Sequence, residues 1–213
     1  MTETAPIVFV IDDDVSFRRS TERLISSVGF RVQPFASAAD FLRARLPDVP
    51  SCIVLDVRMP GIGGLDLQQE LAGRGVDIPI IFLSGHADVL ISVKAMKAGA
   101  VEFLTKPFRD QELLDAINQA INRNVTAREK RAKIARLQAH YEMLTSSERK
   151  VMSGVVSGML NKQIAAELGT SEKTVKFHRA HIMQKMNADS LAELVRMASS
   201  LEIQPPRPQP PAS

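Results

Sequence analysis

The first 124 residues alternate short runs of β-branched and aliphatic residues with longer segments of helical period. This alternation predicts a parallel sheet covered by helices, because strands joined through helices run in the same direction. The expected fold class is therefore α/β, a doubly wound (βα)5 unit whose functional side chains gather at the carboxyl ends of the strands. The expected strands are residues 7–11, 30–34, 52–55, 78–83 and 101–104, and the expected helices are residues 15–28, 38–46, 64–71, 89–98 and 110–121.

The remainder of the chain differs in character, and a length of 213 residues favours two domains. Residues 125–142 are polar and rich in Arg, Lys, Ala and Gln, which predicts a solvated linker helix, with a short coiled coil as the alternative. Residues 143–201 show only helical patterns and predict an all-α domain of four helices. Residues 202–213 hold five prolines and predict a polyproline or disordered tail.

The charge of the chain is divided between its two parts. Residues 1–124 contain 13 Lys and Arg against 16 Asp and Glu, a net charge of −3. Residues 125–213 contain 14 against 8, a net charge of +6. An acidic part joined to a basic part predicts that only the second part contacts nucleic acid.

The composition also limits where the protein acts. Its single cysteine, Cys52, excludes an internal disulfide and favours a reducing compartment, with Cys52 as a small buried apolar residue. No apolar run reaches the roughly 20 residues that span a membrane, and the first residues do not resemble a signal peptide. We therefore expect a cytoplasmic protein without membrane contact.

Acidic and basic side chains follow three of the predicted strands. Asp12, Asp13 and Asp14 follow the first strand, Asp56 follows the third, and Lys106 follows the fifth. Each feature is weak alone, but clustered carboxylates repel one another and favour a bound divalent cation. Mg²⁺ prefers a few carboxylates with phosphoryl oxygens, and a lysine supplies a compact charge for a phosphoryl group. Together these residues predict a phosphoryl-transfer site.

Four motifs resemble the response-regulator receiver family over residues 5–122. They are Ile11-Asp-Asp-Asp14, Leu55-Asp-Val-Arg-Met-Pro-Gly61, Ser84-Gly85 and Phe103-Leu-Thr-Lys-Pro-Phe108. The resemblance implies that Asp56 accepts phosphate from a sensor histidine kinase and that Mg²⁺, or another divalent cation in the acidic pocket, is the cofactor. It implies further roles for other residues: Asp13 and the carbonyl of Arg58 as metal ligands, Asp12 as a ligand through water, Ser84 as a phosphoryl donor, Phe103 as the switch ring, and a cis bond before Pro107.

Two alternatives for this half remain open at the level of sequence. A flavodoxin-like mononucleotide carrier shares the topology but needs a glycine- and hydroxyl-rich loop where three acids stand. A metal-dependent phosphatase with an aspartyl nucleophile is the enzymatic alternative. Such an enzyme uses a second acid two positions after its nucleophile, where this chain has Arg58.

The basic part contains the sequence pattern of a helix-turn-helix motif. A helical segment ends at Gly169, and Thr170 or Ser171 then caps a second helix up to Met186. In this second helix we expect an inward face that packs against Ile164 and Leu168. The residues of that face are Val175, Ile182 and Met186.

The motifs Leu144-Thr145, Asn161-Lys-Gln-Ile-Ala165 and Thr174-Val-Lys-Phe-His178 resemble the LuxR/FixJ-type (NarL-like) DNA-binding domain. The resemblance implies double-stranded DNA as a partner, with RNA polymerase as a further candidate, and a transcriptional regulator rather than an enzyme. A basic domain that binds a protein is the alternative. The candidate DNA contacts are Lys162, Ser171, Lys173, Thr174, Lys176, Phe177, His178, Arg179, His181 and Lys185.

The segment 88–98 is apolar on more than one face of its expected helix. We expect Val89, Val93 and Met96 to enter the core, which leaves Leu90 and Ile91 as surplus apolar residues. A helix with apolar residues all around packs against something further. We therefore predict that this surface forms a homodimer on phosphorylation, with Ile91 in the interface.

Overall fold

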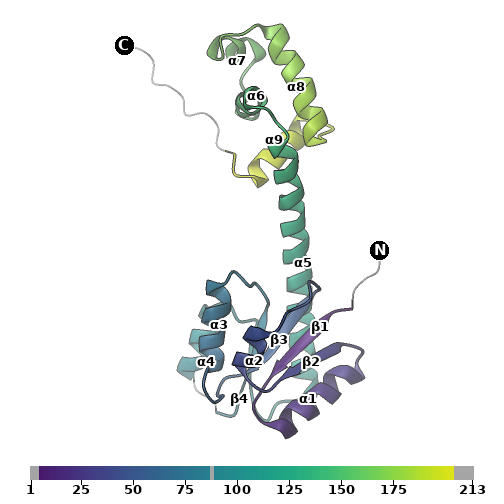
Figure 1. The fold of residues 1–213 in the computed structure, drawn as a ribbon, viewed down its shortest axis with the longest axis vertical. Helices are drawn as coiled ribbons and strands as arrows, with labels where there is room; N and C mark the ends of the chain where they lie inside the picture. Colours follow the sequence, from purple (N-terminus) through teal and green to yellow (C-terminus); the bar gives the residue numbers. More distant parts are fainter. Residues whose placement is uncertain (1–4, 87–88, 204–213) are drawn as a thin grey trace. The chain divides into compact units, whose positions relative to one another are not determined.

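The computed structural model describes residues 5–86 and 89–203, and the chain divides into two compact units, Met1–Arg128 and Glu129–Ser213 (Figure 1). The first unit contains a five-stranded sheet whose strands are β1 (Ile7–Ile11), β2 (Arg31–Phe35), β3 (Ser51–Asp56), β4 (Ile80–Ser84) and β5 (Glu102–Thr105). All pairings are parallel, and the order is β2-β1-β3-β4-β5. The predicted doubly wound (βα)5 fold is confirmed.

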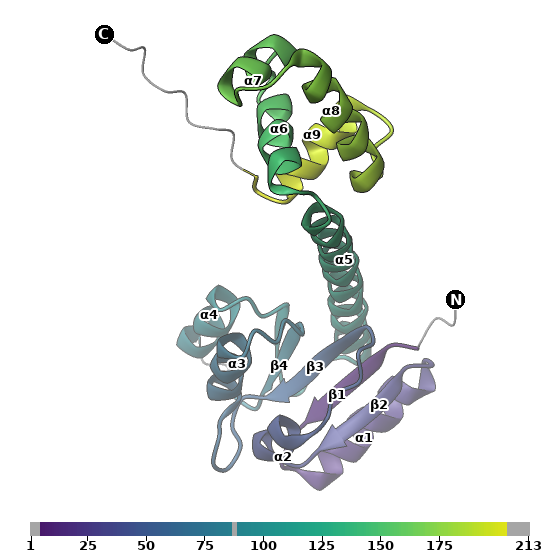
Figure 2. The same cartoon turned by 45° about the horizontal axis from the view of Figure 1, so that its top comes forward.

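Alternate residues of each strand feed two separate cores, one on each face of the sheet. Phe9 and Ile53 pack on the face covered by α2, α3 and α4, whereas Val8 and Val54 pack on the face covered by α1 and α5 (Figures 1 and 2). Because both faces are covered, the central strands read as continuous apolar runs. The helices are α1 (Val15–Ser27), α2 (Ala38–Arg43), α3 (Gly64–Gly73), α4 (Val89–Lys97) and α5 (Asp110–Glu142).

Several element ends differ from the sequence prediction. β2 begins at Arg31 and includes Pro34, which is tolerated because β2 is an edge strand. Helix α2 ends at Arg43 instead of residue 46, since Ala44 is already extended. β4 begins at Ile80 instead of residue 78.

Helix α5 continues without a break from residue 110 to residue 142, where two separate helices were expected. Its middle is fastened to the first unit by polar contacts. The amide of Asn124 accepts a hydrogen bond from the backbone of Ser51 and donates one to the carbonyl of Asp77. Arg128 pairs with the carboxylate of Asp48, with 2.7 Å between Nη1 and Oδ1. The predicted linker is therefore a continuation of the last helix of the first unit.

The packing of α4 corrects one expectation. Val89, Val93 and Met96 were expected in the core but are exposed, at 72%, 43% and 43% of their surface. Ile91 was expected on the outer surface but is half-buried and packs against the first core, beside the fully buried Ala95. The segment has apolar residues on every side, so its periodicity could not show which face turns inward.

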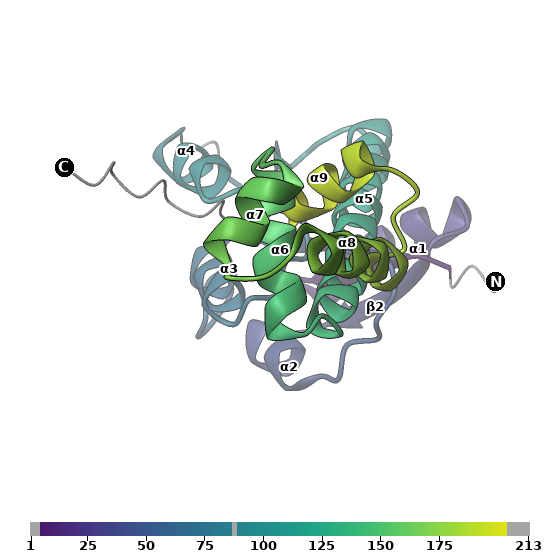
Figure 3. The same ribbon diagram turned by 90° about the horizontal axis from the view of Figure 1, so that it is seen from above.

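Up to residue 203, the second unit contains four further helices around one core, as predicted (Figure 3). They are separated by Gly158, Gly169 and Asn187, each with a positive φ. Within the described residues no helix is long and apolar enough to span a membrane. Of the expected tail, Ile203 packs against this core, and residues 204–213 lie outside the described residues. The helices are α6 (Ser146–Val156), α7 (Asn161–Glu167), α8 (Glu172–Met186) and α9 (Leu191–Ser200).

Candidate functional site

Three predicted site residues converge at the carboxyl edge of the sheet. Asp12 follows β1, Asp56 ends β3 and Lys106 follows β5. The Nζ atom of Lys106 lies 2.8 Å from Oδ2 of Asp12 and 2.7 Å from Oδ1 of Asp56. Both carboxylates are almost fully buried, with exposures of 2% and 7%. The parallel topology thus brings together charges that lie far apart in the sequence.

The electrostatics of this cluster follow from burial and pairing. Burial raises the pKa of Asp12 above its ordinary value, although the hydrogen bond from Lys106 opposes the rise. Burial also acts to lower the pKa of Lys106, but the hydrogen bonds to Asp12 and Asp56 outweigh it and the pKa is raised. Lys106 therefore stays an ammonium at neutral pH and is the shared cation of two buried acids.

The acidic triplet separates into three different environments. Asp12 is buried against Lys106, whereas Asp13 is exposed beside it. Asp14 caps α1, because its Oδ1 accepts hydrogen bonds from the backbone of Ser16 and Phe17 at 2.7 and 3.0 Å. Asp14 therefore acts as a helix cap, and Asp12 and Asp13 are the two acids of the triplet without a capping role.

The donor atoms of the pocket are those that a hard cation prefers. Asp12, Asp13 and Asp56 together carry three negative charges against one ammonium, so the pocket retains a net charge of −2 when all are ionised. Oxygen donors with excess negative charge suit Mg²⁺. Among the described residues, however, no three acidic, His or Cys side chains converge closely enough to form a metal site by themselves. Any cation there needs additional oxygens from the backbone or water.

The neighbouring strands place Ser84 and Phe103 beside the acids. Ser84, at the end of β4, is buried, and its hydroxyl donates to the carbonyl of His86 at 2.9 Å. Phe103 on β5 is half-buried, and its ring centroid lies 6.2 Å from that of Phe82. The bond between Lys106 and Pro107 is cis, as the resemblance implied.

Two residues near Lys106 were not predicted from the sequence as part of the site. The ammonium lies 3.7 Å from the ring centroid of Phe17, a cation–π contact from the first turn of α1. The guanidinium of Arg18 donates to the carbonyl of Asp12. Their position just after the acidic triplet was visible, but nothing in the sequence showed that they turn toward the site.

The helix-turn-helix of the second unit is formed by α7 and α8. Ser171, not Thr170, caps α8, since its hydroxyl accepts from the backbone of Thr174 at 3.1 Å. The predicted inward residues Val175, Ile182 and Met186 are at most 1% exposed and share a core with Ile164 and Leu168. This inward face is confirmed, and it fixes which side of α8 meets solvent.

The candidate DNA contacts fall into two groups. Lys162, Ser171, Lys173, Lys176 and Phe177 are exposed, Phe177 at 58%. The others are half-buried and mostly engaged with neighbours, as the following contacts show. Arg179 donates to Asn161 at 2.8 Å, and Lys185 donates to Glu148 at 2.7 Å. The hydroxyl of Thr174 lies 2.9 Å from that of Ser171. The ring centroid of Phe177 lies 4.1 Å from that of His181 and 6.1 Å from that of His178.

Glu148 is a further residue that sequence reasoning missed. It is 3% exposed and forms a capping box with Thr145 at the start of α6. Burial raises its pKa, but the hydrogen bonds from Lys185 and Thr145 outweigh this and lower the pKa to about 2. The signal was present, because Thr-x-x-Glu before an apolar run is the capping-box pattern. Glu148 therefore anchors α8 to α6.

Comparison with known proteins agrees with this arrangement. Residues 8–118 match the family described as "Response regulator receiver domain", and residues 142–198 match "Bacterial regulatory proteins, luxR family". Nodulation protein W of Bradyrhizobium diazoefficiens is 53% identical over 94% of this chain and 88% of its own. Response regulator protein TodT of Pseudomonas putida F1 is 44% identical over 95% of this chain and 89% of its own.

Solved structures show the same likeness. The structure of response regulator StyR is similar with a TM-score of 0.83 and 46% identity, covering 92% of this chain and 99% of that one. Full-length FixJ from B. japonicum is similar with a TM-score of 0.57 and 41% identity, covering 95% of this chain and 99% of that one. The chain therefore belongs to the two-component response regulators that join a receiver domain to a LuxR-type DNA-binding domain and regulate transcription.

Proposed function

We propose that Asp56 accepts a phosphoryl group from a phosphohistidine of a sensor histidine kinase. A carboxylate oxygen of Asp56 forms a bond to phosphorus, the bond from phosphorus to the imidazole nitrogen breaks, and its electron pair returns to the imidazole. The product is an aspartyl phosphate. The observation that carries this proposal is the buried carboxylate of Asp56 at a strand end, 2.7 Å from the Lys106 ammonium.

Lys106, Ser84 and Phe103 then respond to the added group. A phosphoryl group brings a charge of about −2 at neutral pH, which attracts the nearby ammonium of Lys106. The hydroxyl of Ser84 exchanges the carbonyl of His86 for a phosphoryl oxygen. This movement changes the space beside Phe103, whose ring turns inward from its half-buried position.

Mg²⁺ fits the pocket by the chemistry of its donors. Asp13, Asp56 and the carbonyl of Arg58 would hold the ion, with Asp12 bound through water. The backbone of Arg58 is already tied to Asp56, since its N–H donates to Oδ2 at 2.8 Å. The ion would neutralise charge on the phosphoryl oxygens.

The outer face of α8 and the start of α7 bind the major groove of double-stranded DNA in this proposal. The exposed lysines offer charges to phosphates and guanine edges, and the exposed ring of Phe177 suits a thymine methyl group. Among the half-buried members, Arg179 and Lys185 have intramolecular partners that orient them, Asn161 and Glu148. The proposed contacts are Lys162, Ser171, Lys173, Thr174, Lys176, Phe177, His178, Arg179, His181 and Lys185.

We propose that phosphorylation controls DNA binding through a homodimer. Support comes from α4, where Val89, Leu90, Val93 and Met96 leave a large apolar surface exposed. Within the chain, residues 1–124 act as receiver, 125–142 as linker and 143–201 as DNA-binding domain. Phosphotransfer from a kinase and access to DNA imply a cytoplasmic location, and RNA polymerase is a partner by virtue of the regulatory role.

A phosphorylation assay with a small-molecule donor tests whether Asp56 is the acceptor. Wild-type chain incubated with Mg²⁺ and acetyl phosphate should gain the mass of one phosphoryl group, and Asp56→Asn should gain none because the nucleophile is removed. Asp115→Asn, an exposed acid on α5, is the matched control and should label normally. Stable labelling of Asp56→Asn would assign the acceptor to another residue.

A further inference from the structure

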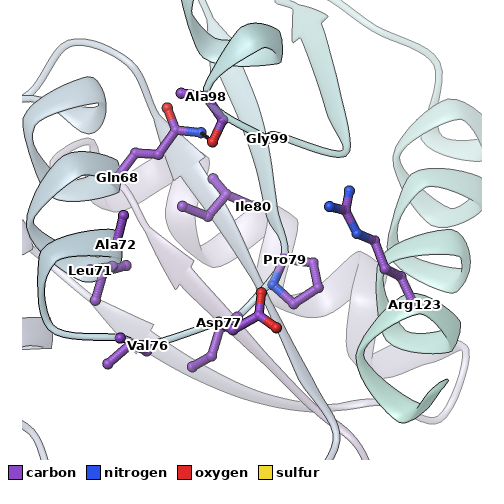
Figure 4. Close-up of a pocket in the computed structure, with 12 residues that line it drawn as sticks. Gln68, Leu71, Ala72, Val76, Asp77, Pro79, Ile80, Ala98, Gly99 and Arg123 are labelled. Carbon is purple, nitrogen blue, oxygen red and sulfur yellow. Dashed lines mark hydrogen bonds between the residues drawn. The ribbon is translucent and has the colours of Figure 1, made fainter. Parts of the chain in front are cut away.

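A cavity of about 300 Å³ lies at the amino edge of the sheet, opposite to the edge that carries Asp56 (Figure 4). It is bounded by α3, by the loop that leads into β4, by the residues that follow α4, and by α5. Its apolar wall includes Leu71, Val76 and Ile80. In Figure 4 these side chains occupy the side of α3 and β4, and Arg123 reaches in from α5.

Two opposite charges face this cavity without neutralising each other. Asp77 and Arg123 both line it and are both exposed. Within the described part of the chain, no ion pair joins them or engages either one with another side chain. The third polar lining side chain, Gln68, already donates to the carbonyls of Ala95 and Ala98 at 3.2 and 3.3 Å. Asp77 and Arg123 are therefore the charged groups left for a ligand.

We propose that this cavity binds a small zwitterion with an apolar side chain, that is, a free α-amino acid. The carboxylate of the ligand pairs with Arg123, its ammonium pairs with Asp77, and its side chain covers the wall formed by Leu71, Val76 and Ile80. A simple acid or amine satisfies one charge only. A polar neutral molecule leaves the apolar wall in contact with water.

The size of the cavity agrees with this class of ligand. A pocket of about 300 Å³ has room for a compound with about ten non-hydrogen atoms. Leucine and related amino acids have about this size. The volume is also at the lower end of ligand pockets, which extend from about 300 to 1,000 Å³.

The site would connect two helices that matter for output. Asp77 is fastened to α5 through Asn124, whose amide donates to the Asp77 carbonyl at 3.2 Å. A ligand that bridges Asp77 and Arg123 adds a second tie between the β4 loop and α5. The same cavity is lined by Ala98 and Gly99, just after α4. A ligand there would touch neither Asp56 nor Lys106, but it would contact the residues that follow α4 and the side of α5.

Titration of the ¹⁵N-labelled full chain with L-leucine tests the proposal. We expect saturable shifts of the amide signals of Gly75 and Gly99, with a dissociation constant on the order of a millimolar. Two matched probes, 4-methylpentanoate without the ammonium and 3-methylbutylamine without the carboxylate, should each bind about tenfold more weakly. Equal binding of the three probes, or no saturable shift at these glycines, overturns the proposal.

Variants of the two charged residues supply the second arm. Arg123→Gln and Asp77→Asn change exposed side chains, so the unliganded spectra should retain the dispersion of the folded domain. Each should weaken leucine binding about tenfold. Arg74→Gln is the matched control, because Arg74 pairs with Glu70 and does not line the cavity. Leucine binding that is unchanged in Arg123→Gln contradicts the assignment.

Discussion

At the scale of single residues, the carboxylate of Glu148 makes a pH-dependent contribution to the free energy of unfolding of the DNA-binding domain. Its pKa is about 2 in the folded domain against an ordinary value of 4.5, so the folded state favours the carboxylate. A group whose pKa is lowered on folding stabilises the folded state at pH values above its unfolded pKa. This contribution is lost as the pH falls from 4.5 toward 2. With allowance for solvent screening this is worth about 2 kcal/mol. The midpoint temperature of the calorimetric unfolding transition of the DNA-binding domain should therefore decrease steeply as the pH falls from 4.5 toward 2.

Glu148→Gln separates this effect from general acid denaturation. The variant should be less stable at neutral pH, because Lys185 loses its partner, and should show a flatter pH dependence below 4.5. Glu167→Gln removes an exposed carboxylate on α7 and is the matched control, with the pH profile of the wild type. An identical slope in Glu148→Gln and wild type would show that other carboxylates carry the acid sensitivity.

Lys176 allows a distinction between base and phosphate contacts on α8. It is exposed and lies outside the inward face that Val175 and Ile182 form. If it reads a base, Lys176→Ala should cost about 1–3 kcal/mol on the cognate site and relax specificity there. If it contacts a phosphate, the loss is uniform across sequences and the slope of log affinity against log salt falls by about 0.9. Affinity unchanged on every DNA would remove Lys176 from the interface.

At the scale of elements, the two ends of α3 respond oppositely to the same substitution. A Cβ added to Gly64 would overlap the carbonyl oxygen of Asp56, so Gly64→Ala should destabilise the receiver by about 1–3 kcal/mol. A Cβ on Gly73 meets nothing within 4 Å, and Gly73→Ala should stabilise the helix by up to about 1 kcal/mol. Thermal unfolding of the receiver measures both. Similar effects at the two positions would mean that β3 and α3 can separate without cost.

The sequence predicted the elements better than their faces and ends. Strands buried on both sides have strong apolar runs, so the sheet and its acidic edge could be placed in advance. The face of α4 was assigned wrongly because apolar residues surround that helix, and only tertiary packing selects Ile91 and Ala95 as the inner ones. In the site, the convergence of Asp12, Asp56 and Lys106 followed from topology. The cation–π contact of Phe17 depends on side-chain direction, which no sequence pattern records.

At the scale of the whole molecule, one uninterrupted helix joins an acidic unit to a basic one. Residues 1–124 carry a net charge of −3 and residues 125–213 carry +6, so only the second unit is attracted to DNA. A single binding module offers a limited number of contacts. Two modules tied together gain affinity through effective concentration without any new contact. A dimer formed through the receiver on phosphorylation would therefore raise the affinity for DNA without any new contact between one module and DNA.

The last prediction tests this dimer on the exposed face of α4. Val93→Glu places a charge on an apolar surface that is 43% exposed, so the fold should persist and phosphorylation should proceed. The phosphorylated variant should sediment as a monomer and bind paired half-sites, one helical turn apart, more weakly than phosphorylated wild type. Lys97→Gln, at the end of the same helix, changes the net charge by the same amount and controls for it.

The correction to α4 supplies an internal contrast for the same experiment. Ile91→Glu places a carboxylate against the receiver core, so it should lower the melting temperature in the unphosphorylated state, before any dimer forms. Val93→Glu should leave that melting temperature close to wild type. Moving a switch from mostly off to mostly on takes about 5 kcal/mol of differential stabilisation, so a charge buried at the interface should hold the equilibrium on the monomer side. Phosphorylated Val93→Glu that sediments as a wild-type dimer would place the interface on another surface of the receiver.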